Sequence, residues 1–130
     1  MKKILSLLAF VTVLSVNAQT SKVINYPFGA AQSFTTATSG TLAVTVSNQM
    51  AVMSAPTLTA AATLSVTASS NLKAGAFMLV AVKTTSTEVT TFAGAVVSPT
   101  VAGVAGKTWT QGFLYNGTYF YPVGTKQQVD

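Results

Sequence analysis

The chain has 130 residues, of which 49% are hydrophobic and only 7% are charged, and it contains neither His nor Cys. This length supports one domain and is too short for two. Without Cys there is no disulfide framework or thiolate nucleophile, and without His the usual general base and commonest metal ligand are absent. The composition therefore predicts no cofactor and no enzymatic activity, and it favours a structural or binding role.

Residues 1–18 have the pattern of a secretory signal peptide. Lys2 and Lys3 give a positive start, an apolar stretch runs from Ile4 to Val16, and small residues precede Gln19. As a helix the apolar stretch is about 20 Å long, against a hydrocarbon core of about 30 Å. We expect a cleavable signal helix, a secreted or cell-surface protein, and no stable membrane span after cleavage.

The charge that remains after cleavage is small and dispersed. Removal of Lys2 and Lys3 lowers the formal net charge from +5 to +3, with Glu88 and Asp130 as the acids. The mature chain has no Arg and no Lys cluster, so nucleic-acid binding is not expected.

From Gln19 onward, short alternating runs of Thr, Ser, Ala and Val predict an all-β fold. Residues 19–40 are the least regular and are expected to form an extended N-terminal arm ahead of a domain at 41–130. Two stretches, Thr41 to Ser47 and Thr63 to Ser69, match at five of seven positions with an offset of 22 residues. Because no third copy follows, we interpret them as two strands with the same burial pattern rather than as a solenoid.

The middle of the chain predicts further strands. Residues 77–82 form a continuous apolar run, which indicates a strand buried on both faces, with residues 88–92 as its hairpin partner and 94–106 as a loop containing a short strand. Turn signals about every ten residues favour a single antiparallel β-sandwich of jelly-roll type. The expected core includes Leu42, Val44, Val46, Leu64, Val66, Leu79 and Phe113.

Asn116-Gly117 predicts a two-residue type I′ turn between strands at 108–115 and 118–123. In this register Tyr115 lies opposite Thr118, and Tyr121 covers Gly112. Only one face of such a hairpin can meet the domain's own core, so the other should cover the arm or a neighbouring subunit. One face carries Trp109, Phe113, Tyr115, Phe120 and Pro122, and the other carries Leu114, Tyr119, Tyr121 and Val123.

Two specific chemistries can be formulated from the remaining residues. A sugar-stacking platform could use Trp109, Tyr115, Tyr119 and Tyr121, but core and interface packing is favoured because few hydrogen-bonding partners accompany the rings. An intramolecular isopeptide bond would need Lys, Asn and an acid to converge, and Lys83 with Glu88 is more simply a surface pair across a hairpin. The parts available for such a bond are Lys83, Lys107, Asn71, Asn116 and Glu88.

Residues 103–108 (GVAGKT) and 113–122 (FLYNGTYFYP), preceded by 89–94 (VTTFAG), resemble the end of small β-modules in phage virion structural proteins and in bacterial surface or filament proteins. The resemblance covers about residues 71–130 and implies a structural role without catalytic residues. The signal peptide favours a secreted bacterial surface assembly over a virion.

We therefore expect a self-assembling subunit of an extracellular filament, sheath or surface layer, because so few charged residues suit a surface covered by copies of itself. The alternatives are a phage decoration or fibre module, and a carbohydrate-binding or adhesin module that contacts glycans or the cell surface. Deleting residues 19–40 is expected to leave a folded domain that no longer polymerises. The candidate subunit-interface residues are Tyr26, Phe28, Phe34, Trp109, Tyr115, Tyr119 and Tyr121.

Export gives a first testable prediction. Cleavage between Ala18 and Gln19 should produce a mature chain that begins at Gln19. Mass spectrometry of the N-terminal peptide of extracellular material measures this directly. Recovery of an intact Met1 in the mature assembly would contradict the signal peptide.

Overall fold

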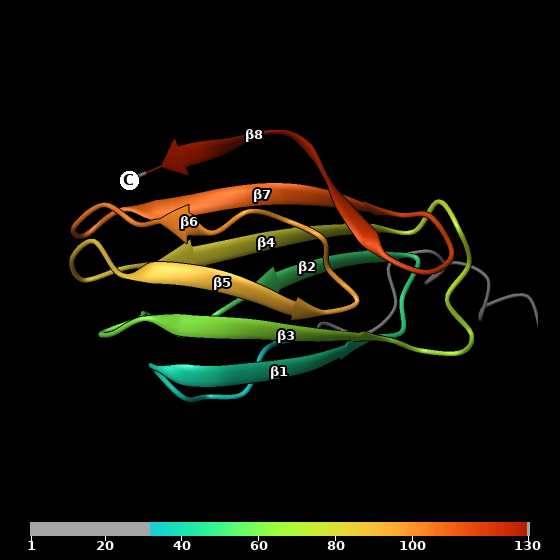
Figure 1. The fold of residues 1–130 in the computed structure, drawn as a ribbon, viewed down its shortest axis with the longest axis horizontal. Helices are drawn as coiled ribbons and strands as arrows, with labels where there is room; N and C mark the ends of the chain where they lie inside the picture. The colour runs from blue at the N-terminus through green and yellow to red at the C-terminus, as the bar shows by residue number, and fades with distance from the viewer. Residues whose placement is uncertain (1–31, 130) are drawn as a thin grey trace, which may run out of the picture.

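The computed structural model describes residues 32–129, which form eight β-strands in two four-stranded sheets (Figure 1). Within this range no helix is present that could cross a membrane. The expected signal helix and residues 19–31 of the arm lie outside the described residues. The first sheet has the order β1 (Gly40–Val46), β3 (Ala62–Ala68), β5 (Val89–Gly94), β6 (Val101–Ala102), and the second has β2 (Met50–Ser54), β4 (Phe77–Lys83), β7 (Thr108–Tyr115), β8 (Phe120–Val129).

The all-β prediction is confirmed, but the prediction of a single antiparallel, jelly-roll-like sandwich is wrong. β1, β3 and β5 pair in parallel, as do β2 and β4, whereas β4–β7, β5–β6 and β7–β8 are antiparallel. The chain crosses to the opposite sheet after each of the strands β1 to β4, so strands adjacent in sequence face each other across the core. For the same reason β5 is not the hairpin partner of β4; it pairs with β3 and β6.

The two matching stretches of sequence are direct neighbours in the first sheet. Gly40 pairs with Ala62 and each following residue of β1 pairs with the residue 22 positions later, so identical side chains stack in four of the seven pairs, such as Leu42 on Leu64. Parallel pairing in this register places equal shapes side by side and keeps one apolar row facing inward. The repeat therefore reports a structural pairing and not only a shared burial pattern.

The core lies between the two sheets and is confirmed in most of its predicted members. Val44 is half-buried against the core, whereas Leu79 points to the outer face of β4, because the inward positions of that strand are Met78, Val80 and Val82. Phe92 crosses from the first sheet to meet two rings of β7, with a centroid separation of 5.3 Å to Phe113. The predicted residues that are fully enclosed are Leu42, Val46, Leu64, Val66 and Phe113.

The turn at Asn116 is longer than predicted. Tyr115 pairs with Phe120, so four residues connect the strands and the register is shifted by two from the predicted one. The Asn116 side-chain oxygen accepts the backbone N–H groups of Thr118 (2.9 Å) and Tyr119 (2.8 Å), which closes the wider loop. Asn side chains stabilise turns in this way without adopting positive φ themselves. Because the shift is even, the two faces of the hairpin keep their predicted side chains, except for Tyr119, which lies in the turn.

Gly117 is the turn residue with positive φ, at +105°, a region that β-branched residues avoid. Replacing Gly117 by Val should lower the free energy of unfolding by about 1–3 kcal/mol, measured by chemical denaturation. Thr118→Val, at the next and exposed position, is the matched control and should change stability little. Equal stability of the two variants would contradict the strained position at Gly117.

Candidate subunit interface

The outer faces of the two sheets differ in chemistry. The outer face of the first sheet is rich in hydroxyl groups, whereas that of the second sheet has two apolar rows that cross all four strands, beyond which lie Ser54, Thr110 and Lys83. Pairing aligns the second face into two rows, Met50–Phe77–Leu114–Tyr121 and Val52–Leu79–Gly112–Val123. We call these eight residues the apolar face. The corresponding positions of the first sheet are Thr41, Ala43, Thr45, Thr63, Ser65, Thr67, Thr91 and Ala93.

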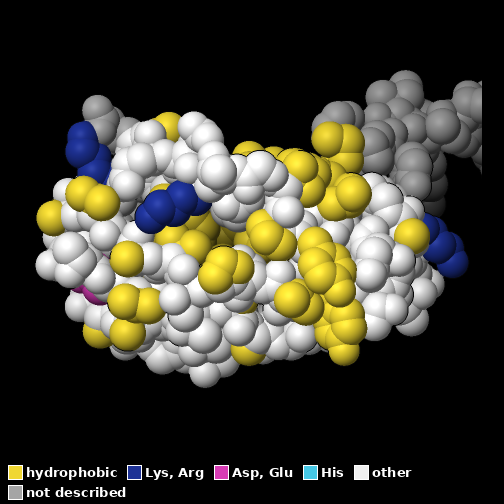
Figure 2. All heavy atoms as spheres, turned by 45° about the horizontal axis from the view of Figure 1, so that its top comes forward, with side chains coloured by type: hydrophobic (Ala, Val, Ile, Leu, Met, Phe, Trp, Pro, Cys, Tyr) yellow, Lys and Arg dark blue, Asp and Glu magenta, His cyan; other side chains and the backbone are white. Residues whose placement is uncertain are grey.

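Several side chains of the apolar face are open to solvent. Val52 is 69% exposed and Val123 is 51% exposed, with Leu114 at 46%. No residue of the two rows carries a charge. Figure 2 shows the domain from the side of β8, where hydrophobic side chains lie in groups among polar ones, with Lys side chains in a few places. Contiguous apolar side chains are common in surfaces that contact another molecule, which makes the apolar face a candidate interface.

Gly112 leaves room for the ring of Phe77 at the centre of the apolar face. A Cβ at this position would lie 3.0 Å and 3.1 Å from two ring carbons of Phe77, so the ring of the neighbouring strand lies over the glycine. The prediction that Tyr121 covers Gly112 is wrong, because the two-residue shift places Val123 opposite Gly112 and Tyr121 opposite Leu114.

The predicted interface residues divide between the core and the surface. Phe34, Trp109 and Tyr115 are buried in the domain's own core, so their side chains are not presented to a neighbouring subunit. Tyr121 is exposed on the outer face of the second sheet, and Tyr119 is exposed in the turn before β8. Tyr26 and Phe28 lie outside the described residues.

Sequence reasoning missed the contribution of β2 and β4 to this surface. The alternation of Met50, Val52 and Ser54 with buried Ala51 and Met53 is a period-two pattern in which both faces are apolar. One of those faces is open because no third layer among residues 32–129 packs on the outside of the second sheet, which a sequence pattern does not give.

The last residues of the predicted arm belong to the folded domain. The Gln32 side-chain amide donates to the Thr45 carbonyl (2.6 Å) and accepts from the Ser47 N–H (3.3 Å), as a backbone amide of a parallel strand would. Thr35 bonds both backbone groups of Ala43. These contacts occupy the free edge of β1. Because Phe34 lies in the core, deletion to Gly40 would remove part of the domain, and the boundary that spares it is residue 31.

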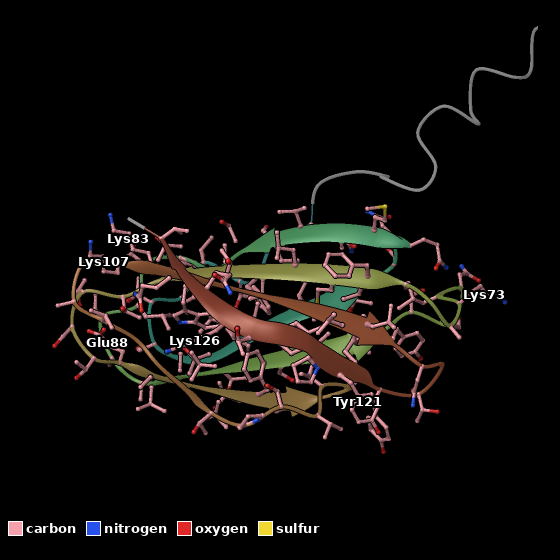
Figure 3. All side chains as sticks on the ribbon, turned by 90° about the horizontal axis from the view of Figure 1, so that it is seen from above. Lys73, Lys83, Glu88, Lys107, Tyr121 and Lys126 are labelled. Carbon is pink, nitrogen blue, oxygen red and sulfur yellow. The ribbon has the colours of Figure 1, made fainter. Side chains whose placement is uncertain are left out.

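Neither specific chemistry formulated from the sequence is assembled. Trp109 and Tyr115 face inward while Tyr119 and Tyr121 are exposed, so the four rings form no common platform. Lys107 and Asn116 flank opposite ends of β7, a strand of eight residues that spans about 27 Å. Figure 3 likewise places Lys83, Lys107 and Glu88 toward one end of the domain and Lys73 toward the other.

Glu88 stabilises the tight turn before β5. Its carboxylate accepts the Thr85 hydroxyl (2.6 Å) and the Ser86 N–H (2.7 Å), and it forms no described ion pair with Lys83. The hydrogen bond from Thr85, followed by that from Ser86, lowers the pKa of the Glu88 carboxyl below its ordinary value, although desolvation opposes the shift.

A pocket of about 340 Å³ lies between β8 and the segment that contains β6. It forms where the β7–β8 pairing is interrupted between Thr110 and Gly112, and the Gln111 amide fills the gap by donating to the Val123 carbonyl (3.1 Å). The Lys126 ammonium group donates to the Ala102 carbonyl (2.7 Å). These contacts brace the edge of the sandwich and bring no acid–base pair together.

Comparison with protein-family models, with curated proteins and with solved structures found no match. Within residues 32–129, no three acidic, His or Cys side chains lie close enough to hold a metal ion. The apolar face is therefore the functional candidate that the geometry itself provides.

The Glu88 turn gives a pH-dependent prediction. A carboxyl whose pKa is lowered by folding stabilises the native state above its unfolded pKa, and this contribution disappears as the pH falls through the folded pKa. Glu88→Gln should therefore be slightly less stable than the parent at pH 7 and equally stable at pH 2, measured by thermal unfolding. A stability difference that is the same at both pH values would contradict a role for the Glu88 charge.

Proposed function

We propose that the mature chain is a non-enzymatic, secreted structural protein that assembles with copies of itself into an extracellular filament, sheath or surface layer. The observation that carries this proposal is the apolar face, which lies on the same domain as a hydroxyl-rich outer face. One side of the domain suits contact with water, and the other suits contact with protein.

The energetics favour a protein partner without charge. A Leu or Val side chain that passes from water into an interface contributes about 1.5–3 kcal/mol before ordering costs. A second copy brings an equally uncharged surface, so contact between two such faces would require no desolvation of ions. With only 7% charged residues in the chain, charge repulsion between copies is weak.

A pair of matched double variants of the 19–130 chain tests the proposal. Leu114→Lys with Val123→Lys places two charges on the apolar face, and Thr45→Lys with Thr67→Lys places two on the exposed outer face of the first sheet. We expect the first variant to remain monomeric and the second to assemble like the parent. Negative-stain microscopy and sedimentation measure assembly, and circular dichroism confirms that both variants fold.

Two outcomes would overturn the proposal. The first is a parent chain that stays monomeric at high concentration, and the second is an apolar-face variant that assembles as well as the parent while remaining folded.

A further inference from the structure

The apolar face is too small to hold two copies together by itself. Two rows across four strands cover about 19 Å by 14 Å, or about 270 Å². A stable interface buries about 800 Å² on each partner. An assembly built on this face therefore needs a second contact, and the edges of the two sheets are the remaining places where a backbone can pair.

Three of the four sheet edges are already protected. The edge of β1 is occupied by Gln32 and Thr35, as described above, and β6 has only two residues. On β8, Phe120 donates to the Ala95 carbonyl and accepts from the Val97 N–H. Beyond it, Pro122 lacks an N–H, and Gly124 has a φ of +70°, which bends the strand. Proline, bends and covering segments are the devices by which proteins prevent edge pairing.

The edge of β2 has none of these devices. Phe77 donates to the Gln49 carbonyl and Ala55 donates to the Ala81 carbonyl, so the odd-numbered residues of this segment bond to β4. The backbone groups of Met50, Val52 and Ser54 consequently point away from the sheet. Among residues 32–129 no strand pairs with this edge, and the strand contains neither Pro nor a charged residue.

We propose that the edge of β2 receives residues 23–26 of a second copy as an added strand, which deepens the proposed function and rests on it. Strand addition at an open edge supplies backbone hydrogen bonds, and the side chains of the added strand extend the sheet face. Here the added strand widens the apolar face, because Met50 and Val52 belong both to that face and to the open edge.

The direction of the chain favours a second copy over the same molecule. Gln32 lies beside Thr45 and Ser47, whereas Thr35 lies beside Ala43, so this segment runs antiparallel to β1. Traced backward from Gln32, it leads past the end of β1 where the chain turns into β2. A straight continuation leaves the domain there, and a return to its own β2 would require a reversal.

The composition and length of the preceding segment suit an added strand. Val23 and Ile24 are β-branched and Tyr26 is aromatic, Pro27 ends this stretch, and residues 23–31 carry no charge. Residues 19–31 span about 43 Å when extended, whereas the five residues of β2 need about 17 Å. Exchange of such a segment from each copy to the next is a head-to-tail contact, which propagates into an open polymer.

Cysteine cross-linking tests the inference on the 19–130 chain, which has no native Cys. Val52→Cys is combined in one chain with Cys at position 23, 25 or 26, and Thr45→Cys replaces Val52→Cys in the matched controls on the protected edge. We expect mild oxidation to give a ladder of covalent dimers, trimers and larger species with at least one Val52→Cys pair, and none with the controls.

Each outcome has a distinct meaning. Internally linked monomers would overturn the assignment to a second copy. Particles that form normally without any link to Val52→Cys would overturn the inference and leave the proposed function intact. A chain that neither links nor assembles would overturn both.

A second variant separates the edge of β2 from the apolar face. Ser54→Pro removes an edge N–H without changing any side chain of the apolar face. The cross-link yield should fall by up to about tenfold, the equivalent of one lost hydrogen bond. The melting temperature should stay near that of the parent, because the N–H of Ser54 makes no bond to β4. An unchanged yield in the folded variant would contradict pairing at this edge.

Discussion

The crossing of the chain to the opposite sheet after each of the strands β1 to β4 is the constraint on which the rest of the structure depends. It makes β1, β3 and β5 parallel to one another and β2 parallel to β4, and it places β1 and β2 at the same side of the sandwich as the first strand of each sheet. Two edges therefore lie side by side at the point where the N-terminal segment enters the domain. Gln32 and Thr35 close one of them, and the other stays open.

Period-two alternation was sufficient to predict strands and most inward-facing residues, but not the partners of the strands. Leu42 and Leu64 face inward in a parallel or an antiparallel sheet alike, so their pattern carries no information on direction. The 22-residue repeat contained that information, since equal residues stack when the strands that carry them are parallel and in register. Two copies are too few to indicate a solenoid, so the repeat was interpreted only as a shared burial pattern and its information on strand direction was missed. The prediction that Leu79 lies in the core was wrong because a continuous apolar run does not show whether its odd- or even-numbered residues face inward.

The candidate interface was predictable to the same extent. The hairpin sequence correctly separated buried Phe113 from exposed Leu114, and the separation survived a register error because the shift was even. Tyr119 and Tyr121 therefore stand on the outside as expected. Phe34 could not be placed from the sequence, since a large apolar residue in a polar segment fits a pocket of its own domain as well as one of a neighbour.

The outer face of the first sheet has a consequence for the medium around an assembly. Its Thr, Ser and Ala rows would be the surface left facing water once the apolar face is covered. Hydroxyl groups hold water by hydrogen bonds rather than by ion hydration, and dissolved salt has little fixed charge there to screen. The hydration of a material coated in this way would therefore be nearly the same in fresh water and in brine, because it depends on hydroxyl groups and not on charges.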